Sequence, residues 1–177
     1  MADGENLILV AVGPDKIGLI EKISEFVVQK GGNIEDSKMA VFAGEFALIL
    51  LLSGDGRNLL EIARSYNELS AMTGLNIWVK HPSRGKSPEG SVPYQLVASC
   101  MDHPGVVYKI SGILSKHGIN IESMETETHE APDSGTPIFR MEATISVPGR
   151  LNIKTLREEL DQVEKEENID LRLEQTP

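Results

Sequence analysis

The stretch DKIGLIEKISEFVVQKGGNIE, residues 15–35, occurs a second time 87 positions later as DHPGVVYKISGILSKHGINIE, residues 102–122. Without any gap, nine of the twenty-one positions are identical. The identical residues include Asp15 and Asp102, Gly18 and Gly105, Gly31 and Gly118, and the triplets 33–35 and 120–122. Internal self-similarity of this length is typical of a duplicated structural unit. The sequence therefore predicts two copies of one domain.

Each copy carries the same order of hydrophobic patterns. Short apolar runs at 7–12 and 94–99 are typical of buried strands, and apolar residues three and four apart then predict a helix. Gly31 and Gly118 stand where a left-handed residue would end that helix. The remaining elements are expected at 33–42, 45–53, 57–72 and 75–81 in the first copy and at 120–128, 138–147, 152–167 and 169–175 in the second.

This strand–helix–strand–strand–helix–strand order is that of the ferredoxin-like split βαβ fold. We therefore expect an α+β protein with two tandem βαββαβ domains, each an antiparallel four-stranded sheet with two helices on one face. The first domain is expected at residues 1–81 and the second at 94–177. Between them lies PSRGKSPEGSVP, residues 82–93, whose Pro, Ser and Gly content is typical of a linker.

Charge and composition restrict the classes of partner. The net charge of −10 and the absence of a basic cluster argue against direct binding of nucleic acid, which requires clustered Lys and Arg. The third strands, 45–53 and 138–147, contain one Phe each, too few aromatics for the base-stacking surface of an RNA-binding module.

The single cysteine and the short apolar runs indicate a location. Cys100 has no second cysteine in the chain, which is typical of a reducing cytosol. The amino-terminal residues resemble no signal peptide, and the densest apolar run, 46–52, is too short to cross a bilayer. We expect a cytoplasmic protein without membrane contact.

No catalytic motif is recognisable in the sequence. The chain has no G-x-S-x-G, P-loop or H-E-x-x-H pattern, and Cys100 and His103 lack the second pair that a zinc site needs. Glu125, Glu127 and His129 alternate along one strand and could hold a cation, but exposed polar alternation explains them equally well. We expect no catalytic residue, no metal site and no cofactor.

The repeated loop is the best candidate for a binding site. In each copy an Asp precedes a Gly that opens a helix, and free N–H groups at a helix start favour an anion such as a carboxylate. Asp15 and Asp102 offer acceptors for an ammonium group, and Asn33 and Asn120 offer amides. Together in one crevice these groups would suit a free amino acid. Alternatively, the Gly permits a tight turn, the Asp caps the helix and the Asn holds a turn.

At these residues the sequence resembles tandem ACT domains. The motif is D-x-P-G-hydrophobic followed, after a helix, by G-x-N-I. The second copy contains it intact as DHPGVV (102–107) and GINI (118–121). The first copy has DKIGLI (15–20) and GGNI (31–34), with Ile17 in place of the proline. A pair of ACT domains of this length without a catalytic domain is similar to the glycine cleavage system transcriptional repressor family.

The resemblance implies a regulator without catalytic activity that responds to a small amino acid, with glycine as the leading candidate, and acts through a DNA-binding partner. A regulatory subunit of a metabolic enzyme and a ligand-free interaction module are the alternatives. In ACT domains the ligand usually lies between the first strand–helix loop and the start of the second strand, often at a domain interface. The matching residues are Asp15, Lys16, Gly18 and Asn33 in the first copy, and Asp102, His103, Gly105 and Asn120 in the second.

The two copies differ on the sheet face that helices cannot cover. In the third strand of the second copy, Arg140, Glu142, Thr144 and Ser146 alternate with apolar residues, as expected for a wet face. The first copy has Ala47, Ile49, Leu51 and Ser53 at the corresponding positions. Its apolar residues on this face of the first and third strands are Ile8, Val10, Val12, Ala47, Ile49 and Leu51. An exposed apolar face needs a partner. We expect a sheet-on-sheet contact there, within the chain or in a homodimer.

Overall fold

Both copies of the repeat form the predicted order of elements. The structure, a computed structural model, describes residues 5–83 and 90–176 of the 177-residue chain. The chain divides into two compact units, residues 1–85 and 86–177, and each unit is described by itself. The first unit contains β1 (Glu5–Pro14), α1 (Leu19–Gln29), β2 (Gly32–Phe42), β3 (Glu45–Gly54), α2 (Gly56–Thr73) and β4 (Asn76–Lys80). The second contains β5 (Ser91–Met101), α3 (Val106–Lys116), β6 (Asn120–Glu130), β7 (Pro137–Pro148), α4 (Ile153–Glu167) and β8 (Asp170–Gln175).

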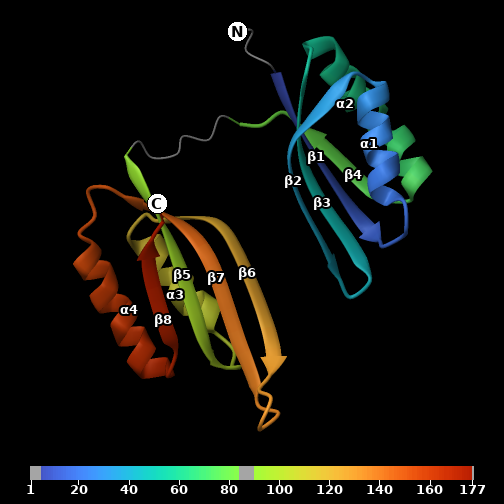
Figure 1. The fold of residues 1–177 in the computed structure, drawn as a ribbon. Helices are drawn as coiled ribbons and strands as arrows, with labels where there is room; N and C mark the ends of the chain where they lie inside the picture. The colour runs from blue at the N-terminus through green and yellow to red at the C-terminus, as the bar shows by residue number, and fades with distance from the viewer. Residues whose placement is uncertain (1–4, 84–89, 177) are drawn as a thin grey trace. The chain divides into compact units, whose positions relative to one another are not determined.

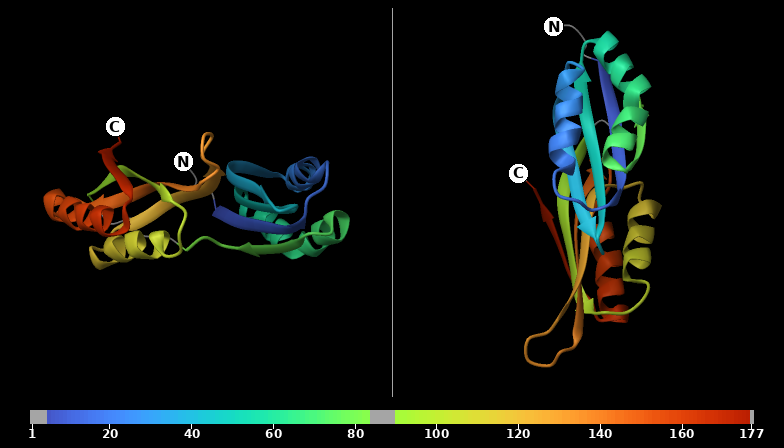
Figure 2. Two further views of the ribbon diagram at one scale, coloured as in Figure 1. Left: turned by 90° about the horizontal axis from the view of Figure 1, so that it is seen from below. Right: turned by 90° about the vertical axis from the view of Figure 1, so that its right-hand side faces the viewer.

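Each unit is a four-stranded antiparallel sheet with both of its helices on one face, which confirms the predicted fold class (Figures 1 and 2). The strand orders are β2-β3-β1-β4 and β6-β7-β5-β8. The two central strands of each sheet, β1 and β3 or β5 and β7, pair along nearly their whole length. We call the face that faces the helices the helix face and the opposite one the open face.

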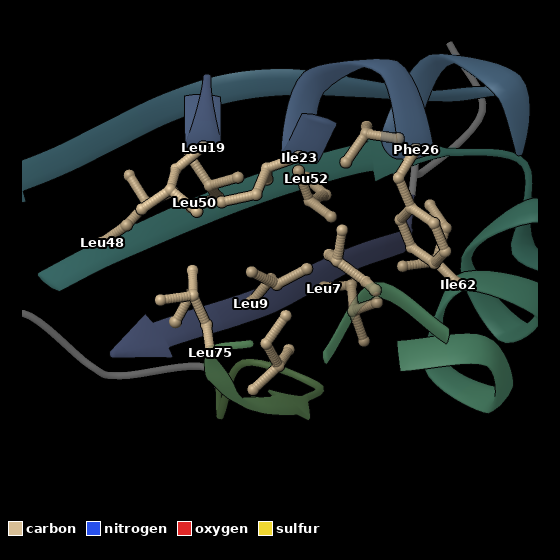
Figure 3. Close-up of a cluster of buried hydrophobic side chains, with 14 of the residues drawn as sticks. Leu7, Leu9, Leu19, Ile23, Phe26, Leu48, Leu50, Leu52, Ile62 and Leu75 are labelled. Carbon is tan, nitrogen blue, oxygen red and sulfur yellow. The ribbon is translucent and has the colours of Figure 1, made fainter. Parts of the chain in front are cut away.

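Alternation along the strands decides which residues enter the core. In β1, Leu7 and Leu9 are fully buried on the helix face, while the residues between them point to the open face. Helix α1 contributes one apolar stripe to the same core, as Figure 3 shows for Leu19, Ile23 and Phe26. Full burial of one such side chain stabilises the fold by about 1.5–3 kcal/mol. The second core repeats this arrangement with Leu96 and Ala98 of β5, Val106, Ile110 and Leu114 of α3, and Leu156 and Leu160 of α4.

Glycine and capping residues end the helices where the sequence indicated. Gly31 and Gly118 follow α1 and α3 with φ angles of 70° and 66°, the predicted left-handed conformation. Ala43 and Gly44 connect β2 to β3 with two positive φ angles, which matches the right-handed twist of a hairpin. At the start of α2 the carboxylate of Asp55 accepts a hydrogen bond of 2.9 Å from the N–H of Arg57.

Strand β5 begins within the last three residues of the predicted linker, 82–93. Strand β5 begins at Ser91, and Val92 and Pro93 already pair with β7, while residues 84–89 lie outside the described residues. Proline has no N–H to donate and is found in sheets only where that donor is not needed. The carbonyl of Pro93 accepts from Thr176 beyond the end of β8, so the missing N–H lies on that side and leaves the ladder to β7 intact.

Candidate functional site

The two strand–helix loops share one backbone arrangement. Gly18 and Gly105 occupy the N-cap positions of α1 and α3 with φ angles of 88° and 103°, a conformation that favours glycine. The N–H of Asp15 donates to the carbonyl of Gly44 across 2.9 Å, and that of Asp102 donates to Pro137 across 2.9 Å. Each loop is therefore tied to the β2–β3 or β6–β7 connection of its own domain.

The aspartates do not cap the helices. Neither α1 nor α3 has a side-chain hydrogen bond at its N-cap, and the first intrahelical bonds are those of Lys22 to Gly18 and Lys109 to Gly105. The first-turn N–H groups are thus left without a helical partner. Asp15 and Asp102 are both exposed, and each lies three residues before the N-cap glycine. Of the alternatives that the sequence left open, the capping role is excluded.

The second loop lies in a denser set of charges than the first. Half-buried His103 places its Nδ1 3.3 Å from the carbonyl of Pro104. The ammonium of Lys109 forms an ion pair with Glu167 at the end of α4. A hydrogen bond from Lys109, together with the charges of Lys109 and His103, lowers the pKa of the Glu167 carboxyl despite its partial desolvation. Burial, and then the charges of Asp102 and Glu167, raise the pKa of the Cys100 thiol.

In the first loop the corresponding charges are fewer. The exposed Lys16 side chain reaches back over the end of α2, where its Nζ lies 3.4 Å from the position that a β-carbon on Gly74 would take. Ile17, which replaces the proline of the second loop, is fully exposed to solvent. Gly13 stands at the position of Cys100, and a β-carbon there would come within 3.0 Å of Leu75. The first loop therefore offers Asp15 and Lys16 as its polar side chains.

The asparagines lie at a β-bulge that occurs in both copies. The amide of Asn33 donates to the carboxylate of Glu35 across 2.8 Å, and the amide of Asn120 donates to Glu122 across 2.7 Å. The pairing of β2 with β3 shifts between Ile34 and Asp36, so Glu35 is the inserted residue. The same shift makes Glu122 the inserted residue of β6. Bulges redirect side chains, and here they turn a carboxylate towards the asparagine two residues earlier.

In each copy a serine from the neighbouring strand also donates a hydrogen bond to the bulge glutamate. The hydroxyl of Ser53 donates to Glu35, and hydrogen bonds from Ser53 and then Asn33 lower the pKa of that carboxyl. In the second copy, hydrogen bonds from Asn120 and then Ser146 lower the pKa of Glu122. Sequence reasoning found the repeated Asn but missed these Glu and Ser partners. The repeated triplet Asn-Ile-Glu was the available signal, but alternation alone places its Asn and Glu on the same face without predicting a bulge.

Within one domain the loop and the asparagine lie at opposite ends of the sheet. Asp15 is bonded to Gly44, at the start of β3, whereas Asn33 pairs with Ser53 near its end. Nine residues of strand separate these two points, a distance of about 30 Å. The reason is that α1 carries the chain back along the whole sheet before β2 begins (Figure 1). The expected single crevice is therefore not formed in either domain, since Asp102 and Asn120 are separated in the same way.

The two open faces differ in chemistry. The six apolar residues predicted to form an interface all point to the open face of the first sheet, and Ile49 remains 47% exposed. The open face of the second sheet is polar, with a shallow depression of about 350 Å³ lined by Gln95, Val97, Ser99, Arg140, Glu142, Asp170, Arg172 and Glu174. There the Nε of Arg140 donates to Glu142 across 3.0 Å. The first open face therefore lacks the charged pairs that make the second one compatible with water.

Over residues 5–83 and 90–176, no three His, Cys, Asp or Glu side chains come together as a set of metal ligands. Within that described part of the chain, no helix is long and apolar enough to span a membrane.

Comparison with known proteins gives the same match in both halves. The ACT domain family matches residues 5–80 and again residues 94–165. The glycine cleavage system transcriptional repressor of Escherichia coli (strain K12) is 25% identical over 142 residues, which cover 80% of this chain and 75% of that protein.

Two solved structures resemble the chain along nearly its whole length. A protein of unknown function from Galdieria sulphuraria has a TM-score of 0.84 and 29% identity, covering 99% of this chain and 100% of the other. A crystal structure of a candidate glycine cleavage system transcriptional repressor has a TM-score of 0.71 and 23% identity, and the alignment covers 99% of both chains.

Proposed function

The chain belongs to the ACT domain family in both of its halves, and from this premise we propose that it is a cytoplasmic regulator without catalytic activity that binds a small amino acid. The similarity to a glycine cleavage system transcriptional repressor over 80% of the chain favours glycine as the ligand. It also favours action through a DNA-binding partner, because a chain of net charge −10 is poorly suited to bind DNA by itself.

The observation that carries the proposal is the uncapped helix start beside an exposed aspartate, present in both copies. At α3 the first-turn N–H groups and the helix dipole favour a carboxylate, and the carboxylate of Asp102 favours an ammonium group. A glycine zwitterion carries both charges within a few ångströms. The loop alone can therefore satisfy both ends of the ligand, without help from the distant Asn120.

The second loop is the stronger of the two candidates. Its DHPG motif is complete, and His103 adds a ring nitrogen beside the helix start. In the first loop, Ile17 replaces the proline and Lys16 extends away over the end of α2. The first loop, with Asp15, Lys16 and Gly18, is accordingly proposed as a weaker site. Asn33 and Asn120 are proposed as separate ligand contacts, since neither is near the loop of its own domain.

Calorimetry with glycine and a panel of other free amino acids tests the proposal. We expect heat of binding with glycine or another small amino acid. Asp102→Asn removes the charge that pairs with the ammonium group and should weaken binding about tenfold or more, since hydrogen bonds to charged groups contribute about 1.5–3 kcal/mol. Asp15→Asn should weaken it less. The matched control is Asp161→Asn on the exposed surface of α4, which should bind as the wild type does.

Two outcomes would contradict the proposal. The absence of heat with every amino acid would exclude the sensor and favour a ligand-free interaction module. Recovery of a metabolic enzyme, in place of a DNA-binding protein, from a pull-down with the full chain would favour a regulatory subunit of that enzyme.

A gel-shift assay with the isolated protein should show no retardation of DNA at physiological salt.

A further inference from the structure

The open face of the first sheet is apolar along its two central strands and is not used by the proposed ligand site. Of the 13 large hydrophobic side chains exposed among the described residues, ten lie in the first domain and three in the second. Trp78 on β4 and Ile49 on β3 are 57% and 47% exposed on this face. Contiguous exposed apolar surface of this kind marks an interaction site.

The strand register arranges this face in three rows that cross all four strands. Partners in neighbouring antiparallel strands point to the same face, so each row runs from β2 through β3 and β1 to β4. The rows are Asp36, Leu51, Ile8 and Lys80; Lys38, Ile49, Val10 and Trp78; and Ala40, Ala47, Val12 and Asn76. In every row the two central residues are apolar. The first row ends in opposite charges, Asp36 and Lys80. The second ends in a cation and an aromatic ring, Lys38 and Trp78.

We propose that this face binds the same face of a second copy of the chain, about a two-fold axis that runs between the sheets along the strands. Such an axis keeps each row opposite itself but exchanges its ends. Strand β2 of one copy then faces β4 of the other, and β3 faces β1. Stacked sheets with nearly aligned strands, about 10 Å apart, are a common way to bury two apolar faces.

The first row supplies an ion pair at each end. Exchange of the ends places Asp36 of one copy opposite Lys80 of the second copy, and the symmetry repeats the contact. Both side chains are exposed in the single chain. The Oδ1 of Asp36 accepts from the N–H of Ser37 across 2.7 Å, and its carboxylate can still pair with Lys80 at the rim, where complementary charges set the orientation of an interface.

The second row supplies a contact between a cation and an aromatic ring. Lys38 at the β2 end lies opposite Trp78 of the second copy, and indole is the ring that attracts an ammonium group best. Between these ends, Ile49 of each copy packs on Val10 of the other copy. The third row contains two alanines, Ala40 and Ala47, which let the two sheets approach closely at that end.

The other two-fold axis in the plane of the sheet fits less well. An axis across the strands would place each strand opposite itself and exchange the first row with the third. Lys38 would then face Lys38 of the second copy, and Asp36 would face Ala40. Like charges in contact oppose association, and the Asp36 carboxylate would lose its partner. The rim charges therefore select the axis along the strands.

The size of the face predicts a reversible dimer. Four strands about 4.8 Å apart and three rows about 7 Å apart give a footprint of roughly 400 Å² per copy, about half of a standard protein interface and in the range of weak, transient contacts. Since interfaces of standard size already extend to micromolar affinity, we expect a dissociation constant on the order of micromolar or weaker. The dimer does not require a bound amino acid, so the test below is independent of the proposed ligand.

Sedimentation velocity over a range of protein concentrations, with exchanged charges, tests the arrangement. The wild type should change from monomer to dimer across roughly 1–100 µM. Asp36→Lys and Lys80→Glu each place like charges at both rim positions and should raise the dissociation constant at least tenfold. An equimolar mixture of these two variants has opposite charges at both positions, and it should associate as well as the wild type.

Three controls complete the experiment. Ile49→Glu should abolish the dimer, whereas Val28→Glu, an equally drastic change on the solvent side of α1, should leave it unchanged. Circular dichroism should show the same fold for every variant. A wild type that stays monomeric would overturn the proposal. So would single variants that still dimerise, or a mixture that fails to associate.

Discussion

The two domains share a fold and a core but differ on the surfaces that the fold does not require. Leu9 and Leu96 stand at equivalent positions of the repeat, and both are fully buried against helices. One residue later, Val10 faces an apolar open face and Val97 faces a charged one. Because side chains alternate along a strand, one face can diverge while the other stays constant. The duplication therefore provided one scaffold with two different outer surfaces.

The contact between the helices has also diverged. In the first domain, Lys30 at the end of α1 lies 3.2 Å from Glu61 and 3.6 Å from Glu68 on α2. His117 stands at the equivalent position of the second domain, and its Nε2 lies 3.1 Å from Glu159 on α4. A basic residue that faces a glutamate of the other helix is kept at this helix end, but a lysine has been exchanged for a histidine.

The comparison of cores predicts the largest effect. Leu9→Ala and Leu96→Ala should each destabilise its own domain by about 2–5 kcal/mol, because each leaves a cavity at a fully buried site. Hydrogen exchange followed by mass spectrometry resolves the two domains, and the fluorescence of Trp78, the single tryptophan, reports on the first. A change below about 1 kcal/mol in either domain would show that the two cores are not equivalent.

The comparison of helix ends predicts a smaller and unequal effect. Gly31 and Gly118 have nearly equal positive φ angles, so Gly→Ala should cost about 1–2 kcal/mol at either position. A β-carbon on Gly31 would also come within 2.4 Å of the Asn58 amide, which donates to the Gly31 carbonyl across 3.1 Å. At Gly118 nothing lies within 4 Å. Gly31→Ala should therefore destabilise by about 1 kcal/mol more. Equal losses in urea unfolding would contradict the contact with Asn58.

The comparison of carboxylates predicts the smallest effect, on acidification. Among the described residues, three carboxyls of the second domain have a lowered pKa, those of Glu122, Glu159 and Glu167. In the first domain the pKa is lowered for one carboxyl, that of Glu35. A lowered folded-state pKa stabilises above the unfolded value of 4.5, and this stability is lost as the pH falls through the folded pKa. The second domain should therefore lose more stability between pH 6 and pH 3.

Domain-resolved hydrogen exchange at a series of pH values measures this difference. The variant Glu159→Gln, which removes the acceptor for Lys116 and His117, should reduce the acid sensitivity of the second domain. Glu158→Gln on the same helix is the matched control and should leave it unchanged. Greater acid sensitivity in the first domain would contradict the comparison.

Much of the architecture was predictable because it depends on local patterns. The repeat predicted two domains, the alternation in 138–147 predicted a packed and a wet face, and Gly31 and Gly118 predicted the ends of two helices. The limits of the strands were less predictable. Pro93 indicated a linker, but it lies in β5, because only the arrangement of neighbouring strands shows which side of a strand lacks a hydrogen-bonding partner.

The candidate sites were predictable as residues but not as arrangements. The sequence by itself determined the repeated Asp, Gly and Asn, the helix starts and the apolar character of the first open face, since each follows from residue type and spacing. Tertiary structure alone decided that Asp102 and Asn120 lie at opposite ends of a sheet, because a helix must return along the strands before the next one begins. It also decided that Asp36 and Lys80 end the same row, because that depends on a bulge and on strand register, and neither follows from the pattern of one segment.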